Sequence, residues 1–409
     1  MTERSFDIIV YGATSFVGQI LTNYLVQHIG VGKNVSWAIA GRSASKLEDL
    51  KVSIGSNAQA LPTIIADAQD PNALSDLAKS ARVIATTVGP YALYGDALVK
   101  ACAENGTDYC DLCGEAYWIK RMILQYGDAA KKSGARIVSC CGFDSIPSDL
   151  GVHFLQQQGK KRYGGYFKSI KLAVNAMKGG ASGGTLASMI EAVKAAKADP
   201  VLRKEMNNPY VLCPERSDFE QTQISIKTPT YDEDFQAWSA PFIMEAINAR
   251  VVLRSNMLEN MAYGDSFLYQ EQVLTGKGFK GRLAAIGMTL GLGLFAVGVI
   301  ISPIRSLLER FVLPKPGEGP SPEAQLAGYF DINLLGKTLD SQQLQVKVTG
   351  DQDPGYGCTA KMLAQASLCL AFDVSQEQRG GGFWTPATAM GDQLIDRLSA
   401  HAGMSFSTL

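Results

Sequence analysis

The chain has 409 residues, of which 46% are hydrophobic and 19% are charged, and its formal net charge is -1. This length exceeds what one ordinary core accommodates, so we expect two domains. The composition is typical of a globular protein and excludes extensive disorder. Because the sequence contains no long basic run, it also argues against nucleic acid as a partner.

Cysteine and histidine usage bears on the compartment and on metal binding. Eight cysteines are far fewer than a disulfide-rich secreted protein contains, and the polar residues 1–7 do not resemble a secretion signal. The Cys110-x-x-Cys113 and Cys140-Cys141 pairs fall at the ends of predicted strands, where buried thiols pack well. The three histidines share no motif. The sequence therefore predicts a cytoplasmic protein without a metal site.

A strand, a glycine-containing turn and a helix open the chain. Residues 6–11 are rich in β-branched and aromatic side chains, as in a buried parallel strand, and an apolar helical pattern begins near Val17. Gly12 permits a sharp turn after the strand, and Gly18 permits close packing of the helix, whose N-terminus can bind a pyrophosphate. Ser15 stands where a middle glycine is usual. The residues predicted to bind a dinucleotide here are Gly12, Thr14, Ser15, Phe16, Val17 and Gly18. The alternative is a β-turn-α unit that binds no ligand.

The second predicted strand, residues 35–40, distinguishes between the two nicotinamide cofactors. Sites for NAD usually end this strand in Asp or Glu, which binds the ribose 2′-hydroxyl. Here the strand is followed by Arg42 and Ser43, with Lys46 one helical turn later. A planar guanidinium and a hydroxyl suit a 2′-phosphate, so we expect NADP(H). The alternative is that Arg42 and Lys46 are solvated surface charges.

Alternating strands and helices continue as far as residue 140. Ligands bind at the carboxyl ends of parallel strands, so the loop after the fourth strand should line the nicotinamide side of the site. Further strands are expected at residues 63–66, 82–88, 109–112 and 136–140, and the cofactor-lining residues in that loop are Gly89, Pro90 and Tyr91.

The loop after residue 140 contains the polar candidates for substrate binding. A nicotinamide reductase must supply a proton or stabilise an enolate after hydride transfer. Asp144 and Ser145 could orient the substrate or a water molecule. They could equally cap the helix that is expected to begin near Ser148 and Asp149. The sequence assigns no catalytic acid.

Together these segments resemble the saccharopine dehydrogenase-like family, and in particular its trans-acting enoyl reductase branch. The motifs that carry the resemblance are residues 12–18, 40–43, 88–91, 109–115, 142–149, 353–356 and 385–391. The resemblance implies an α/β fold: a Rossmann-type doubly wound parallel sheet with an inserted α+β substrate domain and a C-terminal segment that returns to the Rossmann domain. We place these parts at residues 1–163, 164–350 and 351–409. It also implies NADPH-dependent reduction of a lipid-like substrate in glycolipid or polyketide-lipid synthesis.

Residues 283–304 contain no charged side chain. The first 19 of them could reach across a bilayer core of about 30 Å. Lys277, Lys280 and Arg282 precede the segment. We favour a hydrophobic helix or hairpin that contacts lipid or enters one leaflet; a buried core helix and a full membrane span are the alternatives.

The leading functional hypothesis is an NADPH-dependent reductase of an enoyl or carbonyl group in a lipid-like substrate. We expect it in the cytoplasm, associated with a membrane, and a homodimer is compatible with the sequence. One alternative is a cofactor-binding protein at a lipid surface with little turnover. Another is an amino-acid-linked dehydrogenase of the saccharopine type, although the sequence shows no concentrated basic cluster for an amino-dicarboxylate.

Overall fold

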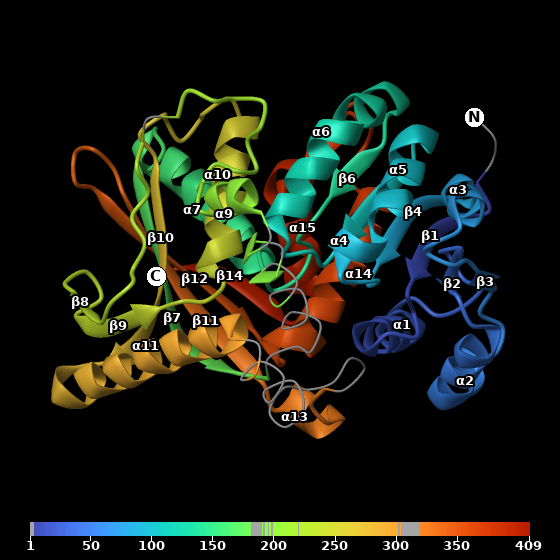
Figure 1. The fold of residues 1–409 in the computed structure, drawn as a ribbon, viewed down its shortest axis with the longest axis horizontal. Coiled ribbons are helices and arrows are strands. Elements are labelled where there is room, and N and C mark those ends of the chain that lie inside the picture. The colour runs from blue at the N-terminus through green and yellow to red at the C-terminus, as the bar shows by residue number, and fades with distance from the viewer. Residues whose placement is uncertain are drawn as a thin grey trace.

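Two β-sheets with different strand directions organise the chain, as Figure 1 shows. The protein is described by a computed structural model at residues 4–180, 190, 193–194, 196–197, 199–219, 221–301, 303 and 319–409. Both sheets have seven strands within these residues. We call them sheet A, which contains the N-terminal strand, and sheet B.

Sheet A is entirely parallel. Its strand order is β13-β6-β5-β4-β1-β2-β3, and every neighbouring pair runs in the same direction. This order, in which β1 and β4 are adjacent at the centre, is the Rossmann arrangement, and it places the ligand crevice at the carboxyl ends of those strands. The strands are β1 (Phe6–Tyr11), β2 (Trp37–Gly41), β3 (Thr63–Ile65), β4 (Ala81–Thr86), β5 (Asp108–Asp111), β6 (Arg136–Val138) and β13 (Gly382–Trp384).

Helices cover both faces of sheet A. Along β1, Ile8 and Val10 pack into one hydrophobic cluster, whereas Ile9 and Tyr11 pack into the other. This alternation follows from the two-residue repeat of a strand and explains why each strand is apolar throughout. The first cluster includes α1 (Phe16–His28), α14 (Thr359–Phe372) and α15 (Pro386–His401), and the second includes α3 (Pro71–Ser80), α5 (Asp96–Asn105) and α6 (Ala116–Ser133). Two further helices near this sheet are α2 (Ala44–Ile54) and α4 (Tyr91–Tyr94).

Sheet B is mixed, with the order β14-β12-β11-β7-β10-β9-β8. Only β7 and β10 pair in parallel within this sheet. One face packs on α7 and α10, so the predicted fold class, a doubly wound sheet with an inserted α+β unit, is confirmed. The elements are α7 (Ile146–Tyr163), β7 (Ser169–Lys178), α9 (Pro200–Met206), β8 (Thr230–Asp232), β9 (Ala237–Pro241), α10 (Glu245–Leu258), β10 (Leu268–Gly276), α13 (Pro322–Leu326), β11 (Tyr329–Lys337), β12 (Gln343–Gly350) and β14 (Met404–Thr408).

The C-terminal segment contributes to both sheets. Strand β13 extends sheet A beside β6, but β14 pairs antiparallel with β12 in sheet B. The segment predicted to return to the Rossmann domain, residues 351–409, thus adds one strand to each sheet. Pairing with β14 satisfies the N–H and C=O groups along the outer edge of β12.

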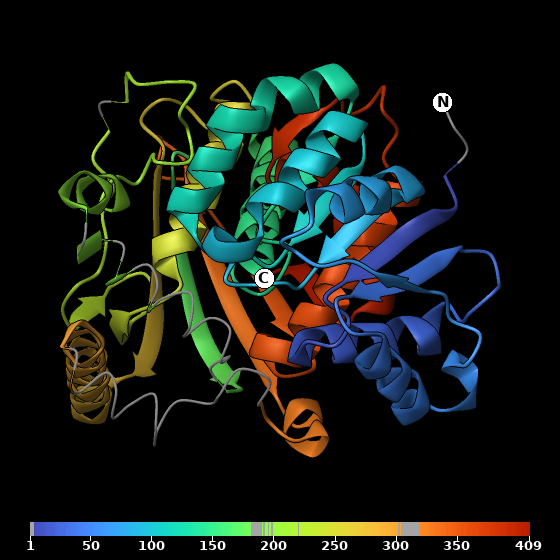
Figure 2. The same cartoon turned by 45° about the vertical axis from the view of Figure 1, so that its right-hand side comes forward.

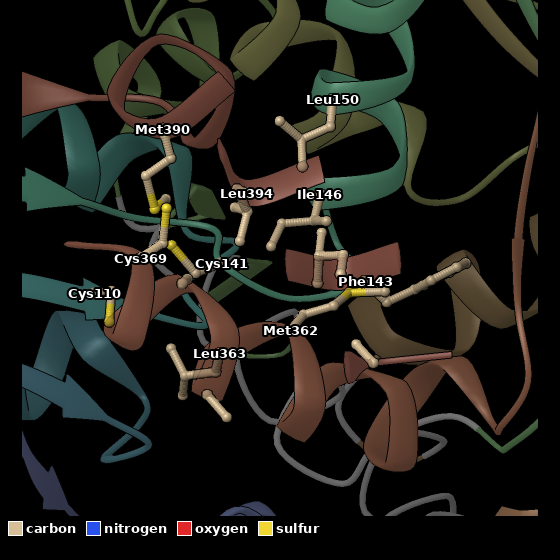
Figure 3. Packing of buried hydrophobic residues seen from close by; sticks show 14 of the residues in the cluster. Cys110, Cys141, Phe143, Ile146, Leu150, Met362, Leu363, Cys369, Met390 and Leu394 are labelled. Atoms are coloured by element: carbon tan, nitrogen blue, oxygen red, sulfur yellow. The ribbon is translucent and has the colours of Figure 1, made fainter. Parts of the chain in front are cut away.

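An apolar core connects the two sheets beneath the carboxyl ends of β5 and β6. Figure 3 shows side chains from α7, α14 and α15 meeting the thiols of Cys110 and Cys141 in this core. Burial raises the pKa of both thiols well above the usual value, so they remain protonated and act as small packing groups. Among the described residues, no group of three His, Cys, Asp or Glu side chains could hold a metal ion.

Helix α11 (Gly278–Ile300) lies outside sheet B, against β9 and β10, at the lower left of Figures 1 and 2. It has 23 residues and is long and apolar enough to cross a membrane, and 17% of its most apolar 18-residue window is buried. The interpretation of this segment as a core helix is therefore wrong. Residues 302 and 304 of the predicted apolar segment lie outside the described residues.

Candidate cofactor and active site

Two glycines shape the turn between β1 and α1. Gly12 has a φ of +85°, and a Cβ at this position would lie 2.6 Å from Cγ2 of Val88. A Cβ on Gly18 would lie 2.2 Å from the carbonyl oxygen of Gly12. Both positions thus require glycine, one for its backbone conformation and both for close approach. The turn brings the N-terminus of α1 to the carboxyl edge of sheet A, where N–H groups can face a pyrophosphate.

Ser15 holds this turn in place. Its hydroxyl accepts a hydrogen bond from the Gly18 N–H at 3.0 Å and caps α1. It also bonds with the Thr87 hydroxyl at 2.8 Å, and Thr87 donates to the carbonyl of Gly12 at 2.9 Å. Ser15, which replaces the usual middle glycine, therefore links the turn by hydrogen bonds to the residue that follows β4. Sequence reasoning missed Thr87, whose only signal is its position directly after the strand that neighbours β1.

The C-terminal segment borders the same turn. Phe16 makes an edge-to-face contact with Tyr356, with ring centroids 4.7 Å apart. Asp353 fixes the short helical turn that carries Tyr356, because its carboxylate accepts the N–H groups of Gly355 and Gly357. Thr14 is partly exposed, whereas Val17 packs against the core.

Positive charge lies at the end of β2. Arg42 and Lys46 are exposed, and no ion pair joins either of them to a carboxylate among the residues described. Ser43 caps α2 by accepting the Lys46 N–H at 3.4 Å. The Gly12 N–H donates to the carbonyl of Ala40 in β2. Arg42 therefore follows, by two residues, a point at which β2 contacts the phosphate turn. A 2′-phosphate could bind there.

Charge reversal at Arg42 tests this arrangement. Arg42→Glu should weaken NADPH binding by about 10- to 100-fold, because it removes a charge-assisted contact and introduces repulsion. NADH binding should change little. Fluorescence titration with both cofactors measures the effect. The control is Lys79→Glu on α3, because Lys79 is also exposed but lies before β4, at the edge of sheet A opposite to Arg42. An unchanged preference for NADPH would contradict the role of Arg42.

The loop after β4 differs in part from expectation. Gly89 is exposed and Pro90 partly exposed, and the peptide between them is cis. Tyr91, expected to face the cofactor, turns inward: it is 6% exposed, donates its hydroxyl to the Thr86 carbonyl at 3.3 Å, and packs on Trp118. Of the three residues predicted to contact the cofactor in this loop, only Gly89 and Pro90 are accessible to it.

Glu115 orders the start of α4, a role that sequence reasoning did not assign. Its two carboxylate oxygens accept the N–H groups of Tyr91 and Ala92, each at 2.9 Å. Glu115 is 3% exposed. It lies in one of the family-like motifs, but its partners lie more than 20 residues earlier in the chain, and no local pattern reveals such a contact.

Asp111 connects the loops that follow β5 and β6. It is fully buried and accepts hydrogen bonds from the Cys113 and Cys140 N–H groups and from the hydroxyls of Tyr109 and Ser139. Burial raises its pKa to about 6, while the four donors oppose this rise. With all its acceptor positions used inside the protein, Asp111 serves to position the two loops.

Asp144, unlike Asp111, has a carboxylate without a hydrogen-bond partner among the described residues. Burial alone raises its pKa to about 6, and no ion pair engages its carboxylate among the residues described. The residue as a whole is partly exposed, whereas its carboxyl group is buried and faces Gly114, where a Cβ would lie 3.5 Å from Oδ2. A buried, unpaired carboxyl group at the carboxyl edge of β6 is available to a bound molecule.

Ser145 is held by α10, the helix that packs on sheet B. It stands at the N-cap position of α7 but makes no capping hydrogen bond. Its hydroxyl donates to Oδ1 of Asn248 at 3.2 Å, and Asn248 donates to Glu271 at 2.9 Å. Burial raises the pKa of Glu271 to about 7. Neither Asp144 nor Ser145 caps the helix, so that alternative is wrong; Ser145 instead fixes the turn that carries Asp144.

Comparison with known proteins identifies the class of the N-terminal site. A family model described as the saccharopine dehydrogenase NADP binding domain matches residues 8–138. The structure of apo saccharopine dehydrogenase (L-Glu forming) from Saccharomyces cerevisiae has the same fold, with a TM-score of 0.57 at 12% identity over 99% of this chain and 100% of that one. The protein is an NAD(P)-dependent oxidoreductase, and its cofactor is NADP(H).

Relatives of the full chain narrow this class. A putative trans-acting enoyl reductase of Mycobacterium tuberculosis is 39% identical, with 100% of this chain and 98% of that protein covered. A trans-acting enoyl reductase of Mycobacterium ulcerans is 37% identical, with 97% and 96% covered. The chain belongs to the trans-acting enoyl reductase branch of the saccharopine dehydrogenase-like family.

Proposed function

We propose that the protein uses NADPH to reduce an enoyl or carbonyl group of a lipid-like substrate, and that Asp144 supplies the proton. The unpaired Asp144 carboxyl group at the carboxyl edge of sheet A is the observation that carries this proposal. The enoyl reductase names of the full-length relatives support the reaction type. Glycolipid or polyketide-lipid synthesis is the setting that we infer.

The chemistry requires one hydride and one proton. Bound NADPH supplies the hydride, which leaves negative charge on the α-carbon and carbonyl oxygen of an enoyl substrate. Protonated Asp144 can deliver its proton to that enolate and be reprotonated when the substrate site opens to solvent. A pKa of about 6 leaves part of the group protonated near neutral pH, whereas an ordinary aspartate would be almost fully ionised.

A small cleft of about 10 Å³ lies beside this loop. It lies between α6, α10 and the ends of β6 and β13, and it includes Cys140, whose pKa is raised in part by Asp144. Most of its lining side chains are aliphatic or aromatic, namely Ile119, Ile123, Ile137, Leu212, Val251, Phe383 and Trp384. Arg254 also lines this cleft. The names of the full-length relatives, rather than the cleft, favour this proposal over a saccharopine-type reaction.

We also propose that the protein lies at the cytoplasmic side of a membrane and contacts lipid through α11. Leu290 and Leu294 are 61% and 74% exposed, which is costly in water and favourable in lipid. A full span is disfavoured because α11 packs against β9 and β10 of sheet B and buries Gly281 and Ala285. A homodimer remains part of the proposal and can be tested by analytical ultracentrifugation.

Membrane flotation tests the lipid contact. The full chain should float with vesicles, and deletion of residues 283–301 should leave it in the soluble fraction with NADPH binding intact. A full-length protein that stays wholly soluble, with no change on deletion, would contradict the contact. Turnover with enoyl thioesters separates an enzyme from a cofactor-binding protein that acts only at the lipid surface.

A further inference from the structure

We propose that the N-terminal end of α11 binds anionic phospholipid headgroups, so that the protein selects a negatively charged membrane over a neutral lipid surface. This inference rests on the proposed lipid contact of α11 and adds a headgroup chemistry to it. It is carried by a group of basic and aromatic residues at one end of an otherwise apolar helix. We call this group, residues 277–282 with Tyr231 and Trp238, the basic-aromatic end.

The basic-aromatic end offers unpaired positive charge. Lys277, Lys280 and Arg282 are all exposed. No ion pair joins any of the three to a carboxylate among the residues that the structure describes. Three lysines elsewhere on sheet B are paired: Lys171 and Lys337 both bind Asp234, and Lys347 binds Asp331. The cations at the start of α11 therefore remain free to bind an external anion.

Aromatic side chains lie at the same end of α11, and one of them contacts Arg282. The Arg282 guanidinium lies 5.3 Å from the ring centroid of Trp238, and that ring makes an edge-to-face contact with Tyr231. Phe279 is 72% exposed and Tyr231 is 40% exposed. Exposed aromatic rings beside lysine and arginine are typical of the boundary between headgroups and hydrocarbon. The basic-aromatic end therefore suits the headgroup layer, and the residues after it suit the hydrocarbon.

The start of α11 is fixed to sheet B, so the charges occupy a defined position. The Thr275 hydroxyl donates to the carbonyls of Gly281, at 2.9 Å, and Trp238, at 3.0 Å. A Cβ on Gly281 would lie 2.1 Å from the Gly276 carbonyl oxygen, so the helix begins in direct contact with the end of β10. A helix held in this way can lie along a membrane surface, with its outer side chains in the hydrocarbon and its first turn at the headgroups.

Binding to vesicles measures the charge selectivity. Full-length protein is titrated with neutral phosphatidylcholine vesicles and with vesicles in which about a third of the lipid is phosphatidylglycerol. Each basic residue near an anionic surface strengthens binding about fivefold, so three should give a preference on the order of 100-fold. Raising the salt concentration should remove most of that preference, because the contact is exposed to solvent.

Variants separate this inference from the lipid contact itself. The triple variant Lys277→Gln, Lys280→Gln and Arg282→Gln should lose the preference for anionic vesicles but keep its weak binding to neutral ones. The control, Lys131→Gln with Lys132→Gln, changes exposed lysines at the end of α6, far from α11 in both ribbon views, and should bind like the natural protein.

Each outcome has a distinct meaning. Equal binding of the natural protein to both kinds of vesicle would overturn the headgroup inference and leave the lipid contact standing. Failure to bind either kind would overturn the lipid contact and the inference with it. Retained NADPH binding in each variant shows that the Rossmann domain is folded.

Discussion

Asp144→Asn is expected to lower kcat for NADPH-dependent reduction by about 100- to 10,000-fold, the usual contribution of a positioned acid or base. Asparagine preserves the size of the side chain but cannot deliver the proton. The change also removes no hydrogen bond, because the carboxylate makes none with the described residues. Stability and the Kd for NADPH should therefore be almost unchanged. Steady-state kinetics with an enoyl thioester and fluorescence titration of NADPH measure the two quantities.

The pH profile provides the matching test of the role of Asp144. Its pKa is raised to about 6, and the proposed donor is the protonated form, so kcat should fall as the pH rises through about 6. Asp144→Asn should flatten that limb. A variant with natural kcat, or a natural enzyme whose kcat rises through the same range, would exclude Asp144 as the proton donor.

Gly18→Ala should abolish measurable NADPH binding, which means a loss of at least about 100-fold, and should lower the melting temperature. The added Cβ would lie 2.2 Å from the Gly12 carbonyl oxygen, and neither backbone segment can move without opening the phosphate turn. Differential scanning fluorimetry with and without NADPH measures both effects, since a bound cofactor raises the melting temperature.

A matched glycine provides the control. Gly287 also lies inside a helix, but a Cβ there would meet nothing within 4 Å. Gly287→Ala should therefore be neutral or stabilising by up to about 1 kcal/mol. If Gly18→Ala bound NADPH as well as Gly287→Ala does, the close approach at Gly18 would not matter for the site.

The sequence predicted those features that depend on local patterns. The alternation of apolar strands and helices predicted the Rossmann fold, and the positions of Gly12 and Gly18 predicted a tight turn whose geometry the structure shows. The absence of an acidic residue after β2 predicted NADP(H), the cofactor that the family supports. In each of these cases the physical cause lies within about 30 residues of chain.

Features that depend on distant contacts could not be predicted. Tyr356 reaches Phe16 only because the chain returns from sheet B to cover sheet A. Asn248 fixes the turn of Ser145 across 103 positions. The inward turn of Tyr91 follows from its packing on Trp118 and its hydrogen bond with the Leu112 N–H. These contacts arise from tertiary packing, so patterns in a single sequence do not predict them.

The return of the chain to sheet A has a consequence during synthesis. Strand β13 and helices α14 and α15 complete the core of the Rossmann domain, yet they begin only at residue 359. While the ribosome is still making the chain, one face of sheet A has no covering from these helices. The nucleotide-binding domain can therefore complete its core only once residues 359–401 have left the ribosome, long after its first strands have emerged.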